Sequence, residues 1–198
     1  RKHIKNNIFI YIGLVLTLMI GVSSGALTIN MLNSTQKSEI INFIDSFLKV
    51  INENDIDNIL IAKQSFFNNF KTLVSIWILG ITIIGIPLII AIVLLRGFVV
   101  GFTVGFLVKE LGVKGLMFSV LSLLPQNIFL IPWIIVSCVV SLNFSTLIIK
   151  SKFNKSIKLN YTSELIRYSA IMGILFLTST IGMLIESYIT PILIKIIS

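Results

Sequence analysis

The chain has 198 residues, of which 56% are hydrophobic and 12% are charged. This balance is typical of membrane proteins and excludes an ordinary water-soluble domain. The formal charge is +8, but the basic residues lie between hydrophobic runs, which argues against nucleic-acid binding. One cysteine and one histidine exclude an internal disulfide and a histidine-based metal site. We therefore expect that the protein is not an enzyme and that it binds neither a metal nor a cofactor.

The first uncharged run lies between Lys5 and Lys37, and its apolar part from Ile8 to Ile29 matches the length of about 20 residues that a helix needs to cross a bilayer. We expect an uncleaved membrane helix after a cytoplasmic basic arm, so that residues 1–29 form one unit. A cleaved signal peptide is the alternative, because Arg1, Lys2 and Lys5 precede the run and small residues stand at 23–26. The run is longer than the hydrophobic part of a typical signal peptide, which favours the membrane helix.

Residues 30–71 carry four lysines against five acidic residues, and this net charge of −1 predicts that the segment lies outside the cell. Hydrophobic residues recur at helical spacing after Ser38 and again after Asp55, which predicts an extracytoplasmic helical hairpin whose first helix has about 14 residues. These faces either pack on the membrane surface and on each other or bind a partner. The candidate partner-binding residues are Ile40, Ile44, Phe47, Ile51, Phe66, Phe67 and Phe70.

Residues 72–198 are expected to form a helical membrane domain. An uncharged run from Thr72 to Leu95 predicts the second crossing. The run from Gly97 to Val108 has only 12 residues, so it is a half-helix or extends into its flanks. The run 115–149 has 35 residues and contains two prolines, so we expect it to break. The run that begins at 168 and continues to 194 predicts the last crossing.

The expected break lies at residues 124–127 and predicts a re-entrant, internal site, because non-helical backbone at membrane depth needs protein or water around it. The candidate residues of this internal polar site are Arg96, Leu124, Pro125, Gln126, Asn127 and Glu186. Two of them have a second interpretation. Arg96 can be a cytoplasmic stop charge, and Glu186 can lie in the membrane interface instead of pairing with Arg96, Lys109 or Lys114.

Gly97, Gly101 and Gly105 repeat at every fourth residue, so they lie near one face of a helix. Small residues at this spacing are typical of helices that pack closely within a membrane. We therefore assign these glycines to helix packing, either within the chain or between the two copies of a homodimer.

Positive charge predicts the orientation. The N-terminal arm and the segment 150–167, with five basic residues against one acidic residue, are both expected in the cytoplasm. An even number of crossings must separate them, which gives about five membrane helices with the C-terminus outside. If residues 97–124 form a re-entrant hairpin, the number falls to four. The fold class is therefore all-α, a polytopic helical membrane protein with a broken or re-entrant central region and an extracytoplasmic helical hairpin.

Three short segments resemble the stage II sporulation protein M family. They are the sequence RGFVVGFTVGFLV from Arg96 to Val108, the residues LPQN at 124–127 with Ile131-Pro132, and Ile185-Glu186 before Thr190-Pro191. The likeness extends over nearly the whole chain, including Gly25-Ala26 and Gln36-Lys37. The wider family usually has Gly and then Glu after the Leu-Pro segment, whereas this chain has Asn127 and Phe129, as in the sporulation branch.

The resemblance implies a multi-pass cell-membrane protein of an endospore-forming bacterium that acts in septal thinning and forespore engulfment, at the sporulation septum and in the engulfing mother-cell membrane. The implied partners are two peptidoglycan hydrolases: stage II sporulation protein D, a lytic transglycosylase, and stage II sporulation protein P, an amidase and endopeptidase. Membrane lipid is the further expected partner. A non-catalytic anchor of a peptidoglycan-remodelling complex is the expected function. A transporter, channel or ABC-permease-like subunit with a re-entrant site near Pro125 is the alternative.

Overall fold

The computed structural model describes residues 7–53, 58–153 and 160–195, and within these ranges it describes the backbone alone at 43–45, 47–53, 58–62, 64–65, 121–126, 153 and 181–195. The described residues are helical, with no strand, and this confirms the all-α class. Three stretches in them are long and hydrophobic enough to cross a membrane: Ile8–Met31, Gly85–Val120 and Asn127–Lys152. The chain is therefore a helical membrane protein.

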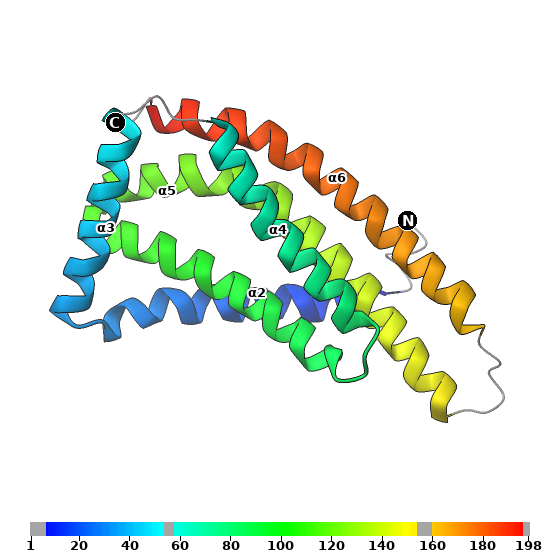
Figure 1. Cartoon of the computed structure of the whole chain (residues 1–198). Coiled ribbons are helices and arrows are strands. Elements are labelled where there is room, and N and C mark those ends of the chain that lie inside the picture. The colour runs from blue at the N-terminus through cyan, green and yellow to red at the C-terminus, as the bar shows by residue number, and fades with distance from the viewer. Residues whose placement is uncertain (1–6, 54–57, 154–159, 196–198) are drawn as a thin grey trace.

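The first helix, α2 (Ile8–Thr28), continues into a short 3₁₀ turn, η1 (Ile29–Met31), and leads to α3 (Ser34–Glu53). Then follow α4 (Asn58–Gly80), α5 (Gly85–Phe153) and α6 (Tyr161–Lys195). Helix α5 consists of two helices that meet at Gly112, where φ is 59° and ψ is −132°. Figure 1 shows that these two halves run in opposite directions and that α3 stands across one end of the bundle.

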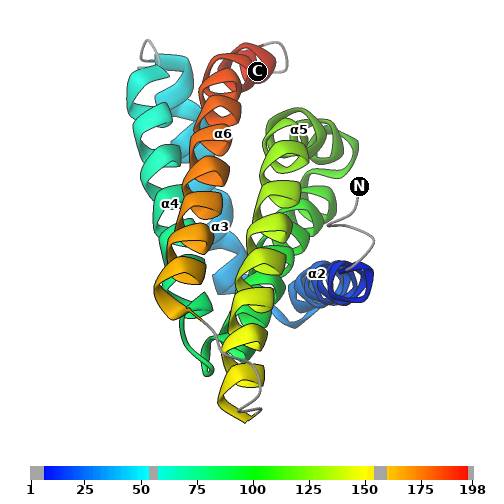
Figure 2. The same ribbon diagram turned by 90° about the vertical axis from the view of Figure 1, so that its right-hand side faces the viewer.

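Five long helical segments alternate in direction along the chain: α2, α4, the two halves of α5, and α6. The turn at 81–84, the C-terminal end of α5 and the start of α6 lie at one end of the bundle, and α3, Gly112 and the C-terminal end of α6 lie at the other (Figure 1). Figure 2 shows the bundle turned by 90°, with α2 seen nearly along its axis, α4 and α6 on one side of α5 and α2 on the other. The second half of α5 thus lies between its neighbours.

The hydrophobic core forms where these segments meet. Leu14 of α2, Ile76 of α4 and Val93 of α5 are all at most 2% exposed and belong to one cluster. The same cluster includes Cys138 and Val139 from the second half of α5, both fully buried, together with residues of α6. Most residues of this cluster lie in α5, because α5 packs against α2, α4 and α6.

The prediction of one crossing over residues 72–95 was wrong, because the chain turns at 81–84 between α4 and α5. Backbone hydrogen bonds close this turn, from Thr82 N to Leu79 O at 3.0 Å and from Gly85 N to Thr82 O at 3.2 Å. Pro87 lies in the first turn of α5, where its missing N–H costs no hydrogen bond, whereas in a continuous helix it would remove one and clash with the preceding turn. The glycine ladder therefore lies in a full-length helix that starts at Gly85.

The prediction of a break at 124–127 was also wrong. The backbone is helical through Leu124, Pro125, Gln126 and Asn127, and the non-helical residue of α5 is Gly112. Glycine adopts positive φ without the steric penalty of a side chain, so the reversal falls there. A membrane helix tolerates proline because its neighbours compensate for the one lost hydrogen bond. The second half of α5 is about 60 Å long, which is more than the thickness of a bilayer. The helix accommodates this excess length by tilting or by protruding from the membrane.

The expected external hairpin of residues 30–71 differs in its second half. Helix α4 begins at Asn58 and runs as one helix along α5 and α6, so residues 58–71 belong to the bundle. Helix α3 has 20 residues, longer than the predicted first helix, and no contact between the backbones of α3 and α4 is found among the described residues.

Candidate functional site

The glycine ladder packs against α2. A Cβ atom at Gly97 would meet the carbonyl oxygen of Leu18, and one at Gly101 would meet that of Val22. At Gly105 it would meet the side chain of Ile29. Gly21 and Gly25 of α2 face α5 in the same way. The two helices therefore touch through their backbones, and the face that the ladder would offer to a second copy of the chain is occupied by α2.

Arg96 lies in the interior of the bundle. Its Nη2 donates a hydrogen bond to Oδ1 of Asn69 on α4 at 3.0 Å, and Asn69 is only 4% exposed. The next residue, Gly97, lies against Leu18 and Gly21, close to the middle of the hydrophobic stretch Ile8–Met31. Arg96 is thus at mid-depth of the crossing helices. This position does not fit a stop charge at a membrane surface. Arg96 lies well inside its helix because the helix begins at Gly85.

A cluster of hydroxyl groups joins α4, α5 and α6. Tyr168 donates to the carbonyl oxygen of Trp77 at 2.9 Å, and its hydroxyl lies 2.8 Å from Oγ of Ser141. The ring of Tyr168 stacks on Phe144, with centroids 4.4 Å apart. Gly80 makes the approach possible, since a Cβ atom there would collide with the Tyr168 hydroxyl. Ser145 donates to the carbonyl oxygen of Thr82 at 2.6 Å and thereby holds the turn between α4 and α5.

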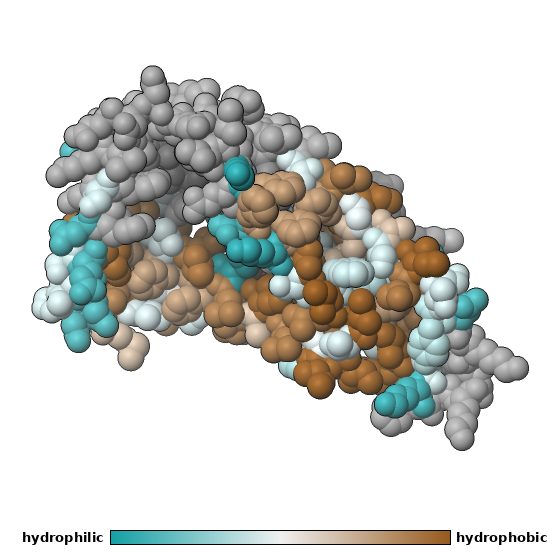
Figure 3. Space-filling model, viewed as in Figure 1, coloured by the Kyte–Doolittle hydropathy of each residue, from teal (hydrophilic) through white to brown (hydrophobic). Residues whose placement is uncertain are grey.

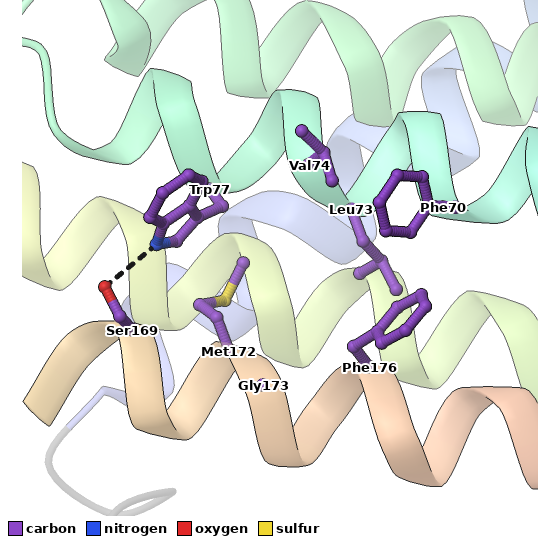
Figure 4. Close-up of a pocket in the computed structure, with 8 residues that line it drawn as sticks. All are labelled: Phe70, Leu73, Val74, Trp77, Ser169, Met172, Gly173 and Phe176. Atoms are coloured by element: carbon purple, nitrogen blue, oxygen red, sulfur yellow. Dashed lines mark hydrogen bonds between the residues drawn. The ribbon is translucent and has the colours of Figure 1, made fainter. Parts of the chain in front are cut away.

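An apolar pocket of about 230 Å³ lies between α4 and α6 (Figure 4). In Figure 4, Trp77 closes one end, where its Nε1 donates to Oγ of Ser169 at 3.2 Å, and Phe70 and Phe176 face each other at the other end. The remaining lining residues are hydrophobic or glycine: Leu73, Val74, Met172 and Gly173. Among the described residues, no carboxylate, histidine or thiol lines this pocket, so its lining is suited to side-chain packing.

The seven candidate partner-binding residues fall on two separate helices. Ile40, Ile44, Phe47 and Ile51 lie on α3; Ile40 is half-buried, and the side chains of the other three are outside the described residues. Phe66, Phe67 and Phe70 lie on α4 and are exposed. Phe66 and Phe70 also contact Phe176 of α6, with ring centroids 5.7 and 5.2 Å apart. The structure therefore does not bring the two groups of residues together.

The residues of the expected re-entrant site are dispersed as well. Leu124, Pro125 and Gln126 lie in the second half of α5, with side chains outside the described residues. Asn127 follows them in the same helix and is half-buried. Glu186 lies in the last third of α6, and its side chain is outside the described residues too. Arg96 is bonded to Asn69, a residue that the sequence analysis did not select.

Sequence reasoning missed Asn69, Tyr168 and Ser141. A signal existed for one of them: Ser137, Ser141 and Ser145 repeat at every fourth residue and are all fully buried. Such a stripe on a membrane helix indicates a polar contact with a neighbouring helix. Asn69 gave no signal, because its partner is 27 residues away and the pairing depends on the turn at 81–84.

Long alternating helices, backbone contact through glycine and buried hydroxyl groups at the helix interfaces define a polytopic α-helical membrane protein. Comparison with protein-family models then identifies the particular group. The model of "Stage II sporulation protein M" matches residues 14–191, and the chain belongs to this family. It is therefore a sporulation-related membrane protein, and the family is not a known enzyme family. No curated protein and no solved structure matched the chain.

Proposed function

We propose that the protein is a non-catalytic membrane anchor of the peptidoglycan-remodelling complex that thins the septum and drives engulfment of the forespore. In this role it holds the hydrolases named stage II sporulation proteins D and P next to the wall. It acts in the septal and engulfing mother-cell membrane. Family membership supports the sporulation role, and the polarity of the bundle supports a docking surface on the wall side.

The observation that carries the proposal is the position of α3. This helix stands across one end of the bundle (Figure 1) instead of lying along it. Among the described residues, one polar contact ties it to the bundle, from Nζ of Lys37 to Oε1 of Glu110 at 3.4 Å. Its hydrophobic residues recur at helical spacing, which is the pattern of a helix that packs on a surface or in a groove. Because α3 does not lie along the bundle, a partner protein can pack along the whole of this helix.

The distribution of charge supports the wall side for α3. Lys150 and Lys152 lie at the opposite end of the bundle, as does the start of α2, which follows a basic arm in the sequence. Short cytoplasmic segments carry an excess of lysine and arginine. With that end in the cytoplasm, five crossings place α3, Gly112 and the end of α6 at the outer surface.

Co-purification tests the proposal. The full-length chain in detergent is mixed with the ectodomains of proteins D and P, and the variant Ile44→Asp/Phe47→Asp is compared with Asn42→Asp/Ser46→Asp. Asn42 and Ser46 are exposed positions of the same helix, so the control adds the same charge. We expect the first variant to lose at least about 90% of the bound ectodomain, as burying an unpaired carboxylate in an apolar contact is costly. Equal binding by both variants would remove α3 as the docking surface.

The alternative of a transporter or channel was based on a break near Pro125, but α5 is helical at this residue. Ser137, Ser141 and Ser145 could line a polar path, but each donates a hydrogen bond to a backbone carbonyl, of Trp133, Ile76 and Thr82 respectively. Ser141 and Ser145 thus bind α4 and the turn that follows it, whereas Ser137 binds the preceding turn of its own helix.

A further inference from the structure

One face of α4 carries charge where its surroundings are hydrophobic. Lys63, Phe67, Lys71 and Ser75 follow each other at every fourth residue and are exposed; we call them the lysine stripe. Figure 3 shows the corresponding contrast, a hydrophilic patch beside α4 within a largely hydrophobic surface. The opposite face of α4 is used by the bundle, through Asn69, Leu73 and Ile76, which are 4%, 7% and 0% exposed.

The depth of the stripe follows from the contact of Asn69 with Arg96. Gly97, next to Arg96, packs beside the centre of α2, and the 3.0 Å hydrogen bond from Arg96 keeps Asn69 within the length of one arginine side chain of it. Lys71 is two residues further along α4 and Lys63 six residues earlier, which are displacements of about 3 and 9 Å. Both are smaller than the half-thickness of about 15 Å of the hydrocarbon core. The stripe therefore lies within the membrane.

A lysine near the bilayer centre needs a partner or a route to water. Lysines near helix ends extend their side chains to the interface, and Lys63 is close enough to do so. Lys71 is too deep for this. Within the part of the chain that the structure describes, neither lysine takes part in a hydrogen bond or ion pair, and the charge of Arg96 is met by the neutral amide of Asn69. Positive charge thus accumulates on this side of the bundle, and the described residues place no acid opposite it.

We propose that the lysine stripe binds a transmembrane helix of another protein, one that carries a carboxylate at mid-membrane depth opposite Lys71. The stripe extends over 12 residues, about 18 Å of helix, which matches a contact between two helices and exceeds a single lipid headgroup. Phe67 and Ser75 supply the apolar and small contacts around the ion pair. This inference does not depend on the docking surface proposed for α3.

A second copy of the chain does not supply this carboxylate. Five of its eight acidic residues precede Asn58 and lie in α3 or just after it. Glu110 pairs with Lys37 near the Gly112 end, Glu164 is in the first turn of α6, and Glu186 lies in the last third of α6. None of the acidic residues that the structure describes is at the level of Lys71. The partner is therefore a different protein, recognised by its intramembrane acid.

Energy transfer in vesicles tests the inference. The donor-labelled full-length chain is reconstituted in phosphatidylethanolamine and phosphatidylglycerol at a ratio of 3:1 with acceptor-labelled synthetic Leu-Ala helices. The helices differ only at their central residue, which is Glu, Gln or Leu. We expect the Glu helix to associate at least about tenfold more strongly than the Leu helix, and Lys63→Leu/Lys71→Leu to remove this difference. Lys114→Leu, at an exposed lysine near Gly112, is the matched control and should keep it.

Two results would overturn the inference. The first is equal association of the three helices, or a preference for Glu that survives in Lys63→Leu/Lys71→Leu. The second is access of water to position 71. The variant Lys71→Cys/Cys138→Ala is treated with a membrane-impermeant maleimide in the absence of any added helix. Full labelling would show that the stripe opens to water, in which case Lys71 needs no acidic partner. Protection from labelling shows that position 71 lies away from water, which is the condition under which Lys71 needs an acidic partner.

Discussion

At the scale of residues, the sequence selected Arg96 and left its surroundings undetermined. An arginine between hydrophobic runs can end a crossing helix or lie inside one. The structure favours a position inside a crossing helix, because Arg96 reaches Asn69 and the adjacent Gly97 packs near the centre of α2. The sequence could not show this pairing, since no local pattern connects two side chains on different helices.

The hydroxyl of Tyr168 gives a prediction at the same scale. Tyr168→Phe keeps the ring on Phe144 but removes the hydrogen bonds to Ser141 and to the Trp77 carbonyl oxygen. Buried groups that lose a partner cost about 1 to 3 kcal/mol. We expect a loss of that size in the free energy of unfolding, measured by circular dichroism in mixed micelles.

Tyr161→Phe is the matched control. Its hydroxyl lies 2.8 Å from that of Ser151, but Tyr161 is 56% exposed, so water replaces the lost contact. A change within about 0.5 kcal/mol is expected there. If the two variants unfold alike, the buried cluster does not stabilise the junction of α4, α5 and α6.

At the scale of elements, the existence of most helices followed from hydrophobic runs, but their ends did not. The run 72–95 reads as one crossing because Ile81, Ile83 and Ile84 are as apolar as the helices on either side. Hydropathy does not distinguish an apolar turn from an apolar helix. Gly80, Gly85 and Pro87 were the available signals, and they mark the positions at which α4 ends and α5 begins.

The contact of α2 with α5 gives a prediction for elements. A Cβ atom in Gly101→Ala would meet the backbone of Val22, with its carbonyl carbon at 2.7 Å, so the two helices would have to move apart. Overpacking of this kind costs about 1 to 3 kcal/mol. We expect a lower unfolding midpoint in detergent, and a larger decrease for Gly101→Leu.

Gly13→Ala tests whether the loss of stability expected for Gly101→Ala comes from the contact between α2 and α5. A Cβ atom at Gly13 has nothing within 4 Å, and alanine favours a helix over glycine by about 0.5 to 1 kcal/mol. This variant should be as stable as the parent or more stable. A comparable loss at both positions would indicate that the glycines serve helix flexibility instead of close packing.

At the scale of the whole molecule, five alternating segments predict a definite topology. In a chain with Cys138→Ala, single cysteines at Ser34 and Lys114 should react with an impermeant maleimide added outside intact cells. Cysteines at Thr82 and Asn160 should react only after permeabilisation. All four sites are exposed and lie in turns or at helix ends. Labelling of Asn160 from outside would invert the topology, and labelling of all four from one side would reduce the number of crossings.

The sequence by itself determined the class of the protein and the presence of a glycine ladder at helical spacing. These depend on composition and on local periodicity, which every stretch of chain carries in its own residues. Only the tertiary structure shows that the glycine ladder faces α2 and that the chain reverses direction at Gly112 and not at Pro125. The hydrogen bond from Arg96 to Asn69 likewise appears only in the tertiary structure. In a membrane, apolar side chains face lipid and protein equally well, so hydropathy does not specify which helix face meets which neighbour.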